Sequence, residues 1–458
     1  MVRPWALSAP IAILLICLPL LRPLRHPAPA AISDSEQAIL ATVQAVVEQH
    51  TLAINQTLYP GSHDVIIRSN WRVYSEQSPV MAVMLSGPYW VMHRWGIRFD
   101  RDPVLTEYLL TLLGVTLPVA LAAGLLYRMG RLFELRRPYR AALALMVVIG
   151  SGWISYATVL NAGAAAAALV IAGAACVVQA TLTKNRIGGL AWTLAAGVLV
   201  SLAATYEPTA TVFLLLMAVV IAAFRWSLTP RLIGIGLYIV GAALPMTLYA
   251  RLNRAVTGDF KPAFMHQELA LDTPDLSSEN TSDDPSATDD SAPKVSVWSE
   301  FLDGVGRTVV ALIGGHGLLS HFPVLIMGVL GVTMVMHRHW PAMTKVLAAA
   351  TLTAAIVIII AYAARPWQWK DPMFANRWFV VFTPLMLFWS GAWLRRSHRK
   401  SSWIWAGSLF AVSAGVALVG AVNPQPPEGY DGYSAAGAVA RLISPAKTPS
   451  QSGLLAQH

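Results

Sequence analysis

The sequence predicts an all-α polytopic membrane protein that crosses a bilayer about eleven times. Hydrophobic residues make up 55% of the 458-residue chain and charged residues only 12%, whereas a soluble domain carries about a quarter of charged residues. The apolar runs are long and rich in Ala, Leu, Val and Gly, without the two-residue alternation of a barrel strand. Backbone groups in hydrocarbon must be satisfied within their own segment, so these runs indicate helices.

A membrane-spanning helix needs about 20 mostly apolar residues, and the expected spans follow from that length. The first run is short and follows Arg3, so a cleaved signal peptide is the alternative to a retained span. No small-residue cleavage site follows it at once, which favours a retained span. The expected spans are residues 6–21, 104–127, 141–159, 162–181, 187–205, 209–224, 232–250, 322–336, 346–362, 374–394 and 403–422.

Basic residues predict the orientation of these spans. They cluster after every second span, on the side that the positive-inside rule assigns to the cytoplasm. This explains the net charge of +9 without a nucleic-acid partner. The N-terminus is then cytoplasmic and the C-terminus outside. The chain forms a single membrane domain, 1–458, with three long outer segments, 22–103, 251–320 and 424–458. Residues 272–293 are acidic and rich in Ser and Pro, which predicts a disordered insert.

The first outer segment carries most of the functional information. Ser33 and Glu36 match a capping box, and apolar residues such as Ile39 and Val43 recur at helical spacing after it. The pattern predicts an amphipathic helix along the membrane surface, with a second surface helix at 79–95. Asp34, just after the first span, suits a general base that accepts a proton from an acceptor hydroxyl. A favourable charge at the start of the helix is the alternative.

These features together resemble the GT-C superfamily of membrane glycosyltransferases, which includes the protein O-mannosyltransferases and the lipid A aminoarabinose transferases. Residues 32–54 are similar to the acidic helix of their first loop. Residues 74–79, Tyr-Ser-Glu-Gln-Ser-Pro, are similar to a segment that reads Tyr-Ser-Asp-Lys-Pro-Pro in many relatives. Further short matches lie at 155–161, 315–321 and 376–379. The sequence departs from the relatives at two places. Gln77 or Ser78 replaces the lysine of the Tyr-Ser-Asp-Lys-Pro-Pro segment, and Gly163 follows Asn161 where a polar residue or His is common.

The resemblance implies the transfer of a sugar from a polyprenyl-phosphate donor to an unidentified acceptor at the outer face of a bacterial plasma membrane. Asp34 would be the base. Arg377 would balance the charge of the leaving phosphate, unless it is an interface arginine beside Trp378. No cofactor is expected, and a requirement for a divalent metal stays open. The other residues expected to bind substrate are Glu36, Tyr74, Asn161, His316 and His321.

Two other functions remain open at this point. A non-catalytic GT-C relative that binds a lipid or a partner would keep the fold and tolerate Gln77 and Gly163. A transporter or flippase would place ionisable residues at mid-membrane and show related halves. Here the charged residues cluster at the ends of the spans and no internal repeat is found. Glu207, between the fifth and sixth spans, is expected in a solvated turn, and a position facing the cavity is the alternative.

Overall fold

The computed structural model describes most of the chain. The described residues are 4–25, 32–59, 65–67, 72–183, 185–223, 228–265, 297–315, 317–364, 374–375, 377–395 and 400–424. The expected insert 272–293, His316 and the tail from residue 425 onward lie outside them.

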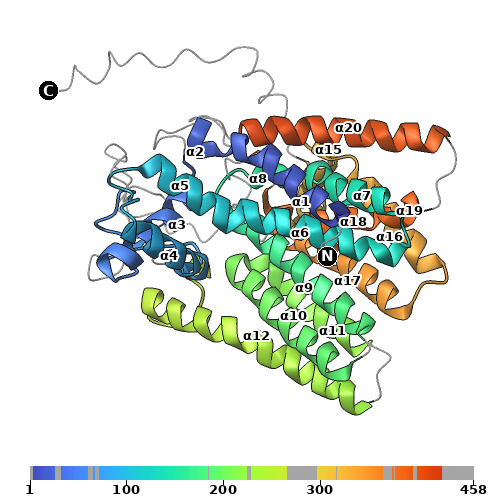
Figure 1. The fold of residues 1–458 in the computed structure, drawn as a ribbon, viewed down its shortest axis with the longest axis horizontal. Coiled ribbons are helices and arrows are strands. Elements are labelled where there is room, and N and C mark those ends of the chain that lie inside the picture. Colours follow the sequence, from blue (N-terminus) through green and yellow to red (C-terminus); the bar gives the residue numbers. More distant parts are fainter. Residues whose placement is uncertain are drawn as a thin grey trace.

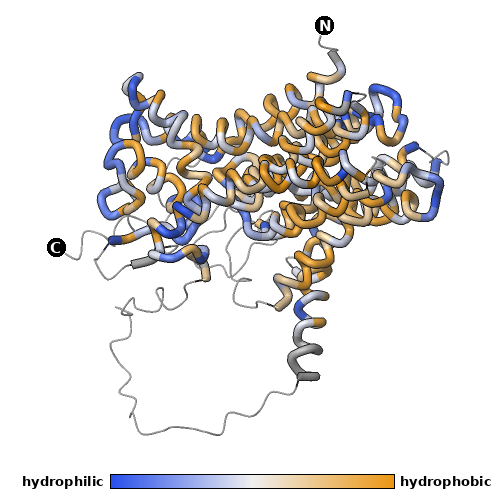
Figure 2. Tube along the Cα trace, turned by 90° about the horizontal axis from the view of Figure 1, so that it is seen from below, coloured by the Kyte–Doolittle hydropathy of each residue, from blue (hydrophilic) through white to orange (hydrophobic). Residues whose placement is uncertain are grey.

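The protein is a helical multi-pass membrane protein. Figure 2 shows a hydrophobic band between two more hydrophilic ends. Within the described residues, seven helical stretches are long and apolar enough to cross a membrane. An eighth is added if the pair Gly304–His321 and Leu325–His337, bent by 94° at the break, forms one span. The seven stretches are Trp5–Arg25, Pro103–Phe133, Ala162–Leu182, Ile187–Tyr206, Leu228–Thr257, Ala342–Ala363 and Lys400–Val422.

The expected count of about eleven spans is not confirmed, because four of the expected runs form short or broken helices. A helix of 13 residues rises about 20 Å, less than the roughly 30 Å of a hydrocarbon core. Gly152 has a left-handed backbone (φ 76°) just after the third run's helix, and Pro384 lies in the first turn of a new short helix inside the tenth run. The short helices are α7 (Arg137–Gly150), α8 (Trp153–Tyr156), α11 (Thr211–Ala222), α16 (Leu325–His337), η9 (Arg377–Phe379), α18 (Thr383–Phe388) and α19 (Ser390–Leu394).

The spanning helices lie side by side, roughly horizontal in Figure 1. Helices α9 (Ala162–Leu182), α10 (Arg186–Tyr206) and α12 (Leu228–Thr257) form one tightly packed group. Glycines allow the backbones of α10 and α12 to approach closely. A Cβ on Gly197 would lie 2.2 Å from the carbonyl oxygen of Tyr238, and one on Gly241 would lie 2.4 Å from that of Leu194. Small residues at such positions are typical of membrane helix pairs.

The remaining long helices complete the bundle. The first span consists of α1 (Pro4–Cys17), η1 (Leu18–Leu20) and α2 (Arg22–Arg25). The second span consists of α5 (Pro103–Thr111), η4 (Leu112–Thr116), α6 (Leu117–Met129) and η5 (Gly130–Phe133). The C-terminal half contributes α14 (Val297–Ile313), α15 (Leu318–His321), α17 (Ala342–Ala363) and α20 (Lys400–Val422). Two short turns of 3-10 helix, η6 (Pro208–Ala210) and η7 (Ala263–Met265), follow α10 and α12.

The first outer segment folds into a small cap at one end of the bundle, on the left in Figure 1. It consists of α3 (Asp34–Gln44), which continues as a π-helix η3 (Ala45–Gln49), a two-stranded sheet and α4 (Pro79–Arg94). Strand β1 (Val65–Ile67) pairs antiparallel with β2 (Val73–Ser75), with Ile66 opposite Tyr74.

The structure confirms the start of α3 but not its expected surface position. Ser33 caps the helix, because its hydroxyl accepts the backbone N–H of Glu36 at 3.3 Å. However, residues 38–45 of the segment are all buried in the protein. Gln44, one of the polar residues of this segment, is buried as well, and its amide donates to Glu48 at 2.8 Å and accepts the N–H of Leu58 at 2.9 Å. Glu48, in the following η3, is exposed. Helix α3 is therefore an internal helix of the cap.

Helix α4 is only half covered. Its aromatic residues Trp90 and, at its end, Trp95 are 52% and 77% exposed. Exposed tryptophans of this kind are common in the headgroup region of a membrane, so the expected interfacial position of α4 stays a prediction.

Candidate functional site

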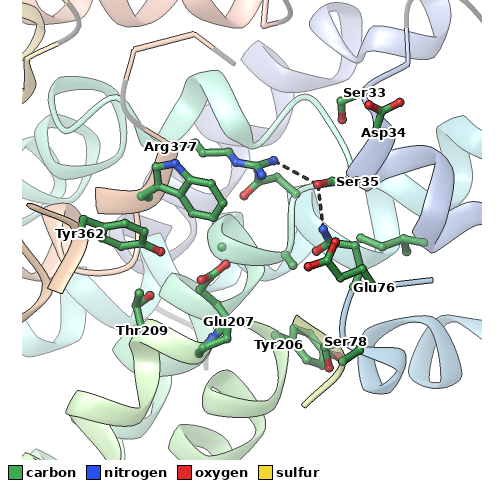
Figure 3. A pocket seen from close by; sticks show the side chains of 18 of the residues that line it. Ser33, Asp34, Ser35, Glu76, Ser78, Tyr206, Glu207, Thr209, Tyr362 and Arg377 are labelled. Atoms are coloured by element: carbon green, nitrogen blue, oxygen red, sulfur yellow. Dashed lines mark hydrogen bonds between the residues drawn. The ribbon is translucent and has the colours of Figure 1, made fainter. Parts of the chain in front are cut away.

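A cavity of about 620 Å³ lies between the cap and the ends of four spanning helices (Figure 3). Segments that are far apart in the sequence converge on it. They are the start of α3, the residues just before α4, the start of α9, the turn between α10 and α11, and the ends of α12 and α17 together with η9. The polar residues of its wall are Ser33, Asp34, Ser35, Glu76, Gln77, Ser78, Asn161, Tyr206, Glu207, Thr209, Tyr249, Asn253, Tyr362 and Arg377.

Ser35 joins three of these segments. Arg377 Nη1 donates a hydrogen bond to the Ser35 hydroxyl at 3.3 Å, and Gln77 Nε2 donates to the same oxygen at 3.0 Å (Figure 3). The Arg377 guanidinium also stacks on the ring of Trp378, 4.2 Å from its centroid. The stacking expected of an interface arginine is therefore present, but it holds the guanidinium at the cavity. Gln77, at one of the two positions considered for the relatives' lysine, supplies a neutral donor there.

Asp34 is the first residue of α3 and lines the cavity next to Ser33 (Figure 3). The position is favourable for a carboxylate whatever its role, since the start of a helix carries partial positive charge. Asn161 also lines the cavity. Its amide oxygen accepts the N–H of Ala164 at 2.8 Å and so caps α9. The structure thus brings Asp34, Asn161 and Arg377 to one cavity.

Glu207 was expected in a solvated turn, with a position facing the cavity as the alternative, and the structure places it at the cavity. The residue follows α10 and its side chain is a wall of the cavity (Figure 3). Its Oε2 would lie 3.7 Å from a Cβ on Gly163. The sequence held a signal for it, because Glu207 is the only acidic residue between Glu134 and Asp259. Glu76, just before α4, is a further cavity carboxylate that the sequence reading did not select.

Glu36 does not line the cavity but belongs to a buried ion-pair network behind it. Arg22 Nη2 lies 3.2 Å from Glu36 Oε1 and 2.8 Å from Glu107 Oε2, and these three side chains are at most 3% exposed. The Tyr59 hydroxyl donates to Glu107. Burial and the adjacent carboxylate raise the pKa of Tyr59 above its usual range, which keeps the hydroxyl protonated as a donor.

This network fixes two walls of the cavity to each other. Glu36 Oε1 accepts the backbone N–H of Leu160 at 3.2 Å, and the N–H of Arg22 donates to the carbonyl of Thr158 at 2.9 Å. Leu160 lines the cavity, and so does Asp34, two residues before Glu36. The carboxylate that was expected to bind substrate therefore holds the start of α3 against the start of α9.

Two further residues expected to bind substrate lie away from the cavity wall. Tyr74 is 5% exposed and packs with Ala53 and Val256. His321 is 3% exposed, with its Nδ1 2.9 Å from the carbonyl oxygen of Gly317. Both occupy packed interiors, because the short strand β2 and the short helix α15 turn their side chains into the protein. As for metals, no three His, Cys, Asp or Glu side chains in the described part of the chain are grouped so that they could hold an ion.

Comparison with solved structures gives the fold. The oligosaccharyltransferase of Archaeoglobus fulgidus, tethered with an acceptor peptide containing the NVT sequon, matches with a TM-score of 0.51 at 11% identity. The match covers 93% of this chain and 56% of that one. The same enzyme in complex with Zn and sulfate matches with a TM-score of 0.51 at 10% identity, over 92% of this chain and 54% of that one. The fold is of the GT-C type.

The similarity to these solved structures is limited in length and in sequence. The chain spans a little more than half of the length of these neighbours, and at this identity the match concerns the fold alone. No model of a known protein family matches the sequence, and no curated protein matches it either.

Proposed function

We propose that the protein is a membrane glycosyltransferase that moves a sugar from a polyprenyl-phosphate donor to an acceptor. The observation that carries the proposal is the cavity that brings Asp34, a carboxylate, and Arg377, a guanidinium, together from opposite ends of the chain. The GT-C fold and the oligosaccharyltransferase function of the neighbouring solved structure support the same class of reaction.

In the proposed step, the acceptor attacks the anomeric carbon of the sugar from the face opposite the phosphate. The bond between that carbon and the phosphate oxygen breaks, and its electron pair stays with the polyprenyl phosphate. A bond from the acceptor oxygen or nitrogen to the anomeric carbon forms with inversion. The acceptor proton passes to the Asp34 carboxylate, which acts as a general base.

Arg377 would stabilise the negative charge that develops on the leaving phosphate. Such charge must be balanced in a poorly solvated site, and a guanidinium can hold two phosphate oxygens with parallel N–H donors. Ser35 and the ring of Trp378 orient the guanidinium. Gln77 would add a neutral donor beside it, and this weaker contact replaces the second cation that the family resemblance implies.

The distribution of charge supports an active site on the outer face. Two of the cavity-lining helices end at the cavity and have basic residues at or next to their opposite end. Arg186 starts α10 while Tyr206 ends it at the cavity. Lys345 lies in the first turn of α17 and Tyr362 in its last. By the positive-inside rule the cavity then faces away from the cytoplasm, which fits the proposed bacterial plasma membrane with a cytoplasmic N-terminus.

The experiment is turnover of labelled polyprenyl-phosphate sugars by membranes that contain the wild type, Asp34→Asn or the control Asp100→Asn. Asp100 is an exposed aspartate outside the cavity. We expect Asp34→Asn to reduce turnover by about 10²- to 10⁴-fold, the usual contribution of a general base, and Asp100→Asn to leave it unchanged. Full activity of Asp34→Asn would refute the role of Asp34. If the wild type consumes no donor in a panel that active GT-C enzymes use, the protein is a non-catalytic lipid-binding relative.

A further inference from the structure

The side of the cavity away from Asp34 carries a second group of polar side chains. In Figure 3, Glu207, Thr209 and Tyr362 lie across the cavity from Asp34. Asn253 of α12 completes this group of cavity-lining residues. It contains a carboxylate, a hydroxyl, a phenol and a carboxamide. Its neighbouring cation is Arg377, whose guanidinium stacks on Trp378, the ring that packs on Tyr362.

The side chain of Asn253, a residue only 1% exposed, lies within hydrogen-bonding reach of the Tyr249 hydroxyl. The buried hydroxyl oxygen of Thr209 lacks a hydrogen-bond partner within the described part of the chain. Leaving a buried polar group unsatisfied costs free energy, and nearly all such groups in proteins are paired. The terminal torsion of an asparagine side chain is broad, so a small rotation aims the amide nitrogen at a ligand in the cavity.

A sugar ring satisfies each of these groups. Its hydroxyls donate to the Glu207 carboxylate and accept from the Asn253 amide, and the Thr209 hydroxyl can do either. Its apolar C–H face can pack on an aromatic ring, and Tyr206, Tyr249 and Tyr362 line the cavity. Ligand sites typically combine such apolar walls with a few convergent polar groups.

We propose that Glu207, Asn253 and Thr209 form the subsite that binds the hydroxyls of the donor's sugar, and that Glu207 selects against acidic sugars. The inference rests on the proposed function and adds the chemical class of the sugar. A uronic acid would place its carboxylate near Glu207, with Glu76 as a second cavity carboxylate, and like charges at close range are unfavourable. The subsite therefore prefers an uncharged, polyhydroxylated sugar.

The test measures binding of three lipids to the purified full chain in detergent by their effect on its melting temperature. The lipids are polyprenyl phosphate, a polyprenyl-phosphate hexose and the matching polyprenyl-phosphate hexuronic acid. We expect the hexosyl lipid to bind wild type more tightly than the other two. Glu207→Gln weakens its binding by about 10- to 100-fold, the range for a hydrogen bond to a charged group, and removes the discrimination against the uronic acid. The affinity for polyprenyl phosphate itself is unchanged.

A matched control and a second variant keep the outcome interpretable. Glu134→Gln makes the same chemical change at a side chain that is 71% exposed and far from the cavity, and it binds all three lipids as wild type does. Asn253→Ala, which removes the second hydroxyl contact, weakens the hexosyl lipid selectively as well. The inference is overturned if Glu207→Gln and Asn253→Ala both keep wild-type preference for the hexosyl lipid. Failure of the proposed function looks different, since wild type then binds none of the three lipids.

Discussion

Arg22→Met removes the cation from a buried network and leaves two carboxylates behind. In the native protein, the Arg22 side chain donates hydrogen bonds from Nε and Nη2 to Glu36 Oε1 at 3.3 and 3.2 Å and from Nη2 to Glu107 Oε2 at 2.8 Å. All three side chains are almost fully buried. Methionine has nearly the same reach, so the change removes charge with little loss of packing.

The expected cost is about 3–5 kcal/mol of unfolding free energy, the range observed when one partner of a buried ion pair is removed. The exposed pair of Arg395 and Glu134, with side chains 39% and 71% exposed, serves as the control. Arg395→Met should cost less than about 1 kcal/mol, because water already screens that pair. Because both variants replace a paired arginine by methionine, the difference between their unfolding free energies reports the effect of burial and not merely the presence of a salt bridge.

The assay is denaturant titration of the detergent-solubilised protein, followed by the fluorescence of its 16 tryptophans. Adding Glu36→Gln to Arg22→Met should restore part of the lost stability, since it neutralises one of the two uncompensated carboxylates. The reasoning is refuted if Arg22→Met and Arg395→Met destabilise equally, or if the double variant is less stable than Arg22→Met alone.

Two further predictions concern glycines at close contacts. Gly331→Ala places a Cβ 2.0 Å from the carbonyl oxygen of Trp389 and should destabilise the protein by about 1–3 kcal/mol through overpacking. Gly407→Ala, where no atom lies within 4 Å, should be neutral or stabilising by up to about 1 kcal/mol; equal melting temperatures for the two variants would contradict this. Gly163→Ala brings a Cβ to 3.2 Å from Asn161 Oδ1 at the cavity wall. It should therefore weaken donor binding more than it lowers the melting temperature, which lipid titration and a thermal melt can separate.

The membrane class and the start of the cap could be predicted from the sequence because both depend on local patterns. Long apolar runs specify spanning helices whatever they pack against, and Ser33 specifies a helix start through its own hydroxyl. The number of spans could not be predicted in the same way. Hydropathy does not distinguish a continuous helix from one that a glycine or proline breaks, as Gly152 and Pro384 do here.

The site was predictable only in part, because burial and pairing depend on distant segments. Asp34, Asn161 and Arg377 do line one cavity. Glu36 was also expected to bind substrate, but it pairs with Arg22, which in turn pairs with Glu107, 71 positions beyond Glu36. The local sequence around Glu36 does not indicate these ion pairs.

Glu207 shows the opposite case. A polar residue between two spans is usually solvated, and the sequence alone left open whether Glu207 faces water or a cavity. The cap formed by α3 and the residues before α4 covers that turn and converts it into a cavity wall. Only the contact between segments distant in the sequence decides between these outcomes.

The most direct test of the central claim is a cryo-electron microscopy structure of the full chain with a bound, non-transferable polyprenyl-phosphate sugar. We predict density for the phosphate beside Arg377 and Ser35, with the anomeric carbon facing Asp34 and the sugar ring against Glu207. Density for the lipid at any other site, with this cavity holding neither phosphate nor sugar, would contradict the proposal.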